Sequence, residues 1–163
     1  MSDVFYLRDL EPAVTKSDVS EMAISAGGCF NLHRVDWHRS LLAMDGSRML
    51  CWYQAPDSES VRNALRQLGS DMNKVWSAAG NLADLSLDEV NLVVEASAAT
   101  FTLPDSVNSL VQSAAEVQSM DGRQRLLLLC CDSAAVASQA LSDSAAGTDV
   151  RCWACEPINP NDL

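Results

Sequence analysis

Histidine and basic side chains are scarce in this 163-residue sequence, and it contains no long apolar run. There are 2 histidines, and 11 lysines and arginines stand against 22 aspartates and glutamates, so the formal net charge is −11. An acidic surface of this kind repels phosphate backbones and anionic lipid, so we expect neither nucleic acid nor membrane as a partner. The longest uninterrupted apolar run, from Leu126 to Cys131, is too short to cross a bilayer.

The start of the sequence also lacks the basic region and the apolar core of a secretory signal peptide. We therefore expect a cytoplasmic protein whose 6 cysteines stay reduced. Cys152 and Cys155 form a C-x-x-C pattern, but it lies at the predicted end of a strand, where no helix follows to activate a thiol. Side chains three apart on a strand point to opposite faces, which favours a packing role for both cysteines. P-loop, Rossmann and H-E-x-x-H motifs are absent as well.

The most informative feature that the sequence does contain is an internal repeat. Met44-Asp45-Gly46 returns as Met120-Asp121-Gly122, and each copy leads into an apolar run. Each copy predicts the order strand, helix, strand, strand, helix, strand, which is that of a ferredoxin-like unit. We expect the first unit at residues 1–80, a degenerate second unit at residues 89–157 and a tail at residues 158–163.

Pairing of the two units follows from their exposed sheet faces. A four-stranded sheet with helices on one side leaves its other face bare, and two units in one chain can bury these faces against each other. The predicted fold class is therefore α+β, with two tandem ferredoxin-like (βαββαβ) units that form a pseudo-dimeric α+β barrel. We expect the chain to be a monomer with an internal pseudo-dimer.

Local signals predict the boundaries of several elements. Thr15 is a candidate helix N-cap, and Gly27-Gly28 predict the end of that helix. Asp45-Gly46 is a type I′ hairpin signal between two strands. Pro104 suits the first turn of a shortened helix in the second unit. The strands that form the hairpin and end the chain are predicted at residues 35–43, 48–55 and 148–155.

The register of this hairpin places candidate functional groups on one face. With a two-residue turn, Ser40 faces Cys51 and His38 faces Tyr53. Asp36, His38, Cys51 and Tyr53 then share a face of the sheet. An imidazole and a thiolate, from His38 and Cys51, suit a borderline-soft divalent metal, and Asp36 can add a carboxylate or orient the ring.

Other interpretations of the same face stay open. His38 can act as a base, with Asp36 beside it and Tyr53 as a hydrogen-bond donor, in acid–base chemistry on a small apolar substrate inside the barrel. His38 and Tyr53 can also bond only to each other in a structural role. In a further alternative, the acidic helices bind a protein partner.

One segment resembles a known family. Cys51, Tyr53 and Ala55-Pro56-Asp57, preceded by the strand with Trp37 and Ser40, are similar to a bacterial family of small domains of unknown function. These domains are often labelled nickel-binding, after a nickel-responsive member. The resemblance covers about residues 3–78, and Gln54 stands where the family usually has Glu. It implies a ferredoxin-like domain that pairs as a dimer, and a divalent transition metal, nickel, as the bound cofactor.

The candidate groups occur in only one copy of the repeat. The positions of Trp37 and His38 are taken by Ser113 and Ala114 in the second copy. A scaffold that keeps its reactive groups in one half has specialised that half. Our leading hypothesis is a module that binds a small molecule or a transition-metal ion, with its site in the first unit.

Overall fold

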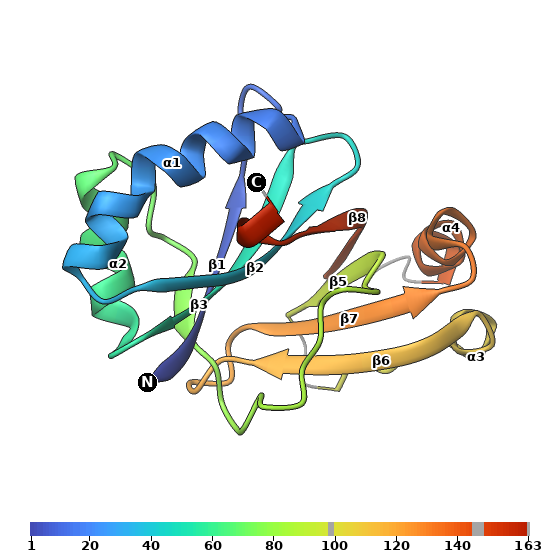
Figure 1. Cartoon of the computed structure of the whole chain (residues 1–163). Helices are drawn as coiled ribbons and strands as arrows, with labels where there is room; N and C mark the ends of the chain where they lie inside the picture. Colours follow the sequence, from blue (N-terminus) through green and yellow to red (C-terminus); the bar gives the residue numbers. More distant parts are fainter. Residues whose placement is uncertain (98–99, 145–148, 163) are drawn as a thin grey trace.

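The computed structural model describes residues 1–97, 100–144 and 149–162, which form a curled antiparallel sheet with helices on its outer side (Figure 1). The predicted α+β class is confirmed. Along the chain the elements are β1 (Ser2–Asp9), α1 (Lys16–Leu32), β2 (Asp36–Ala43), β3 (Arg48–Ala55), α2 (Ser58–Gln67), β4 (Val75–Ser77), β5 (Leu92–Ala96), α3 (Asp105–Asn108), β6 (Val111–Gln118), β7 (Arg125–Cys131), α4 (Ala134–Ser144), β8 (Val150–Ile158) and the 3₁₀ helix η1 (Pro160–Asp162).

The 8 strands lie in the order β4-β1-β3-β2-β8-β5-β7-β6, so each half of the chain contributes four neighbouring strands. The halves join where β2 pairs with β8, from Ser40 opposite Ile158 to Ala43 opposite Cys155. At the two ends of this order, β4 and β6 are followed by residues that meet in a single bridge, Ala78 with Ser119. The sheet therefore curls until its two edges touch.

The inner face of the curled sheet is a shared apolar core. First-half residues such as Phe5 and Leu50 pack in one cluster with second-half residues such as Val93 and Leu128. Leu87, from the segment that connects the halves, is 1% exposed and belongs to the same cluster. The expected burial of one half's open sheet face against the other's is therefore observed.

The outer face of the sheet is covered by helices, more completely in the first half than in the second. In the first half, α1 and α2 cover a cluster that includes Val4, Tyr53 and Leu65. In the second half, α4 covers most of the outer face, because α3 has only 4 residues against 17 in α1. The shortened helix expected in the second half is therefore present.

The start of α1 is as predicted, but its end is not. The Thr15 side chain accepts a hydrogen bond from the Asp18 backbone, and the Asp18 side chain accepts one from the Thr15 backbone, which makes a capping box. The helix then continues through Gly27-Gly28 to Leu32. A helical glycine costs only about 1 kcal/mol relative to alanine, and burial of the Phe30 ring on the sheet outweighs that cost.

The last strand is longer than the predicted 148–155, because its end completes the sheet. Pro157 and Ile158 lie opposite Leu41 and Ser40 of β2, and Ile158 is fully buried. Apolar contact therefore holds Ile158, which the sequence assigned to the tail at residues 158–163. No helix in the described part of the chain is both long and apolar enough to span a membrane.

An ion cluster around the buried Arg48 side chain also ties the two halves together. Arg48 of β3, whose side chain is 1% exposed, donates from Nε to Glu95 Oε2 of β5 at 2.8 Å and also contacts Asp9 of β1. Arg151 of β8 reaches Asp9 Oδ1 at 3.2 Å, and the Trp153 indole donates to Glu95 at 3.1 Å. Removing Arg48 would leave Glu95, which is 15% exposed, without its cation, and that is costly.

Candidate functional site

The predicted hairpin register holds on one side of a β-bulge and fails on the other. Ser40 lies opposite Cys51, as expected. The register shifts between Trp37 and Arg39, so His38 is the extra residue and Trp37 lies opposite Tyr53. A bulge adds one residue to one strand and re-aims the side chains before it. The expected pairing of His38 with Tyr53 is therefore wrong.

As a result, His38 is not brought together with either of its expected partners. Its ring lies edge-on to Trp52, with 4.4 Å between the ring centroids, and Trp52 belongs to the inner core. Cys51 and Tyr53 belong to the outer cluster beneath the helices. Asp36 is exposed at the start of β2. The sheet thus separates the imidazole from the thiol and the phenol.

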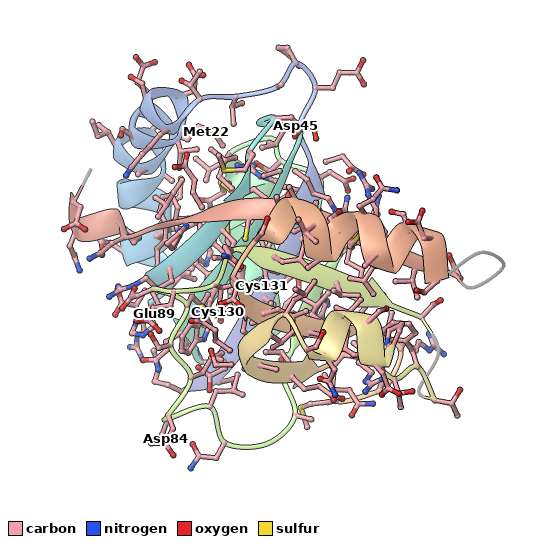
Figure 2. All side chains as sticks on the ribbon, turned by 90° about the vertical axis from the view of Figure 1, so that its right-hand side faces the viewer. Met22, Asp45, Asp84, Glu89, Cys130 and Cys131 are labelled. Carbon is pink, nitrogen blue, oxygen red and sulfur yellow. The ribbon has the colours of Figure 1, made fainter. Side chains whose placement is uncertain are left out.

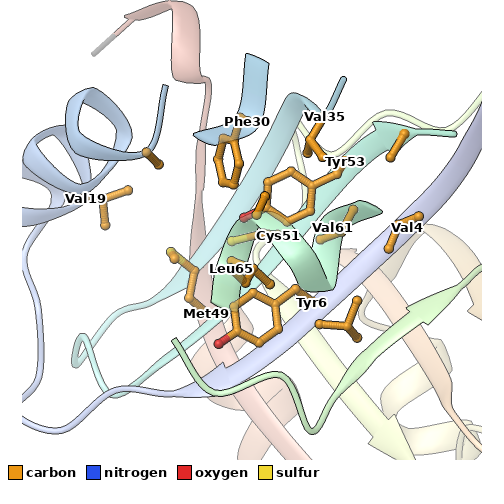
Figure 3. Packing of buried hydrophobic residues seen from close by; sticks show 14 of the residues in the cluster. Val4, Tyr6, Val19, Phe30, Val35, Met49, Cys51, Tyr53, Val61 and Leu65 are labelled. Carbon is orange, nitrogen blue, oxygen red and sulfur yellow. The ribbon is translucent and has the colours of Figure 1, made fainter. Parts of the chain in front are cut away.

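Cys51 and Tyr53 do lie together, in surroundings that keep both neutral. Figure 3 shows Cys51 between the rings of Tyr53 and Tyr6, with Phe30 beside Tyr53. Burial raises the pKa of the Cys51 thiol and raises the pKa of the Tyr53 phenol well above its ordinary value. Metals bind the thiolate, so a thiol held in this form is a poor ligand.

The described residues do not fit the metal site that the sequence suggested. Within residues 1–97, 100–144 and 149–162, no group of three or more histidine, cysteine, aspartate or glutamate side chains could hold a metal ion. The acid–base hypothesis also loses its geometric support, because it needed His38 beside Tyr53. The roles proposed for Asp36, His38, Cys51 and Tyr53 stay predictions.

The C-x-x-C cysteines behave as their spacing predicts. Cys152 packs on the helix-covered side, with its Sγ 3.4 Å from the Ser138 hydroxyl. Cys155 lies in the inner core, where burial raises the pKa of its thiol to about 12. The two thiols face opposite sides of β8, and neither forms a disulfide.

A cavity of about 430 Å³ opens beneath α1 in the first half, next to Tyr53. This volume lies in the range of about 300–1,000 Å³ that is typical of small-molecule sites. Its floor is the outer face of the sheet, and its walls come from α1, α2 and the residues after α2. The lining residues are Arg8, Asp18, Glu21, Met22, Ser25, Ala26, Phe30, Trp37, Met49, Tyr53, Leu65, Leu68 and Ser70.

Aromatic rings form one end of this cavity. Phe30 meets Tyr53 and Trp37 edge-on, with centroid separations of 5.3 Å and 6.4 Å. The bulge at His38 makes this possible, because it turns Trp37 toward the helices. The Trp37 indole N–H is already satisfied by Ser40 Oγ at 2.8 Å, so the ring offers the cavity an apolar surface.

Among the described residues that line this cavity, Arg8 is the one cation. Its Cζ lies 5.4 Å from the centre of the Tyr6 ring, and one Nη lies 3.8 Å from Met22 Sδ. Its Nε is buried without a hydrogen-bond partner, and no described carboxylate lies within ion-pair distance of it. All the lining residues lie between positions 8 and 70, in the first half, and Figure 2 shows Met22 far from Asp84 in the connecting segment.

Sequence reasoning did not single out Arg8, although a weak signal was present. The apolar run predicts a first strand at Val4–Leu7, which ends two residues before β1 does. With the strand extended to Asp9, alternation puts Val4, Tyr6 and Arg8 on one face. A basic residue on the helix-covered face of a strand is unusual, because lysine and arginine are rarely buried unless they are paired.

Comparison with known proteins supports the resemblance of the first half. Residues 6–77 match the family described as "Nickel responsive protein SCO4226-like". The matched segment contains every residue named in the cavity lining. No curated protein matches the chain significantly. Among solved structures the chain is similar to "Putative Chlorite dismutase TA0507", at 12% identity and a TM-score of 0.47, over 99% of this chain and 95% of that chain.

Proposed function

We propose that this protein binds a small molecule with an apolar body and an anionic group, in the cavity beneath α1. The observation that carries the proposal is Arg8, a cation at an aromatic-lined cavity with no carboxylate partner among the described residues. Burial of part of a charged group costs free energy unless the group is paired. A carboxylate on the ligand would supply the missing partner.

The surroundings of Arg8 favour a ligand of mixed character. A guanidinium binds carboxylates through two parallel hydrogen bonds, and such bonds are stronger where water is partly excluded. The rings of Phe30, Trp37 and Tyr53 would hold the apolar part through burial of its surface. These two requirements define an amphipathic anion such as an arylalkanoic acid.

A pair of matched compounds tests this function by titration calorimetry. 3-Phenylpropanoate should bind, and 3-phenylpropanamide, which has the same shape and no charge, should bind at least about tenfold more weakly. Arg8→Met should abolish this preference for the anion. Arg66→Met is the matched control, because Arg66 lies on α2 outside the cavity lining. Equal binding of the acid and the amide would contradict the proposal.

Nickel binding is a second candidate, and only the family match supports it. The family name belongs to a nickel-responsive protein, and a response to nickel needs no nickel site in every member. Of the family-matched residues, Cys51 is buried as a neutral thiol, and the Asp57 side chain caps α2. Titration of the protein with nickel, copper, zinc and cobalt would decide this candidate.

We also propose that the two halves are tandem ferredoxin-like units and that the intact chain is a monomer. The strand order β4-β1-β3-β2 in the first half has the same form as β8-β5-β7-β6 in the second, when each half is counted from its own first strand. The inner core would then replace the interface between two separate domains. Light scattering of the purified chain should give the mass of one copy.

A further inference from the structure

We infer that the ligand of the cavity beneath α1 is a zwitterion, with an amino group as well as a carboxylate, in the manner of an apolar amino acid. This inference rests on the proposed function, because it assigns the carboxylate to Arg8. It adds a second polar contact, between the ligand's ammonium group and Glu21 at the mouth of the cavity.

The positions of the charged groups carry the inference. Glu21 and Asp18 line the same cavity as Arg8, and both lie on the exposed first turns of α1. Neither carboxylate forms an ion pair with Arg8, although Arg8 touches Met22, the residue next to Glu21. Opposite charges thus line one cavity without meeting. A ligand that carries both charges would satisfy the two sides at once.

Glu21 is the better ammonium acceptor of the two acids. The Asp18 carboxylate already accepts hydrogen bonds from the Thr15 backbone N–H at 2.6 Å and the Thr15 hydroxyl at 2.8 Å, so it is committed to the helix cap. The Glu21 side chain has no hydrogen-bond or ion-pair partner among the described residues. Ser25, one turn further along α1, also lines the cavity and can accept a bond from an ammonium group.

The cavity also limits what lies between the two charged groups. Met22 of α1 and Met49 of β3 give it apolar walls, and Phe30, Trp37 and Tyr53 form its aromatic end. A ligand with its charges close together near Arg8 would point an apolar side chain toward these rings. This geometry favours amino acids with large apolar or aromatic side chains over small or charged ones.

Three compounds on one skeleton test the inference on the full chain by calorimetry. L-Phenylalanine carries both charges, 3-phenylpropanoate lacks the ammonium group and 2-phenylethylamine lacks the carboxylate. We expect phenylalanine to bind about fivefold more tightly than 3-phenylpropanoate, as an exposed ion pair allows. In Glu21→Gln this preference should fall to about one, and Arg8→Met should weaken both acids by about tenfold.

The outcomes separate this inference from the function on which it rests. If 3-phenylpropanoate binds as tightly as phenylalanine and both need Arg8, the proposed function stands and the zwitterion is ruled out. If neither acid binds, or if Arg8→Met changes nothing, both are overturned. A preference for phenylalanine that survives Glu21→Gln also contradicts the inference. Circular dichroism would show that each variant keeps the helical and strand content of the parent chain.

Discussion

His38 and Cys51 lie on opposite faces of one sheet, although they are diagonal neighbours in the regular hairpin that their sequence predicts. The extra residue in β2 turns His38 onto Trp52 and turns Trp37 toward Tyr53 instead. The bulge therefore takes a polar ring away from the helix-covered side and gives the cavity an indole. The strand segment that the sequence offered as a metal site instead supplies Trp37 and Tyr53 to one wall of the cavity.

Substitution of the two residues at the bulge should have unequal effects on stability. Trp37→Ala should lower the free energy of unfolding by about 2–3 kcal/mol, because Trp37 packs on both Phe30 and Tyr53 beneath α1. His38→Ala should cost less than about 1 kcal/mol, since it removes one ring contact. Urea denaturation of both variants measures the difference. Equal losses of unfolding free energy would contradict the packing of Trp37 beneath α1 that the bulge produces.

Cys51 should not act as a nickel ligand in the folded chain. Its thiol is buried and its pKa is raised by that burial, so deprotonation near neutral pH is unfavourable. Nickel added at micromolar levels should therefore give no thiolate-to-metal absorption band, and Cys51→Ser should titrate as the parent chain does. A band that disappears in Cys51→Ser would overturn this expectation and revive the metal site.

The protein should lose stability in alkaline solution because of its buried thiols. Cys155 keeps its proton to about pH 12 in the fold, whereas an unfolded cysteine releases it near its ordinary pKa of about 9. Above pH 9 the free energy of unfolding should therefore fall, by up to about 1.4 kcal/mol per pH unit from this one group. The loss should be visible between pH 9 and 11 in urea midpoints.

Cys155→Ala should flatten this alkaline decline, and Cys130→Ala is the matched control on a half-buried thiol. Both variants remove one sulfur from the second half. An identical pH dependence in Cys155→Ala and the parent chain would show that another buried group, such as Tyr53, controls the decline.

Loss of the buried arginine between the halves should be severe. Arg48→Met leaves Glu95 without its cation in a site where that carboxylate is 15% exposed, and should cost about 3–5 kcal/mol. Arg48→Met combined with Glu95→Gln should cost less than Arg48→Met alone, because the stranded charge is then removed. The exposed Arg66→Met should stay within about 0.5 kcal/mol of the parent.

The first half should not be stable alone as a monomer. A fragment of residues 1–85 would expose the inner sheet face, including Phe5, Leu50 and Trp52, which the second half covers in the intact chain. We expect this fragment to aggregate or to pair with itself in size-exclusion chromatography. A folded, soluble monomer would contradict the pseudo-dimer.

Much of the fold is predictable because several of its signals are local. The cap at Thr15 and the repeated order of elements need only neighbouring residues to act. The turn at Asp45-Gly46 is also local, but the predicted type I′ is wrong, because Gly46 has a positive φ and Asp45 does not. The end of α1 is not set by a local signal. The helix passes through two glycines because the sheet holds Phe30 in place. Ile158 is held in the same way, by β2.

The candidate site was less predictable than the fold for a related reason. A bulge has no strong residue signature, and one extra residue reverses the face of every side chain before it. The sequence therefore placed Tyr53 and Cys51 correctly on one face of the sheet, but it wrongly placed His38 beside them and did not indicate that this face is the one covered by helices. Arg8 is a candidate ligand-binding residue because no described carboxylate pairs with it, and the sequence alone does not indicate which charged groups will meet in the folded chain.

The pairing of β2 with β8 has a consequence for synthesis on the ribosome. The edge of β2 that receives residues 155–158 belongs to the first half, whereas the strand that covers it is the last one to be made. While the second half is still being translated, this edge and the apolar face beside it stay open to solvent. We expect the nascent first half to depend on chaperones until β8 emerges.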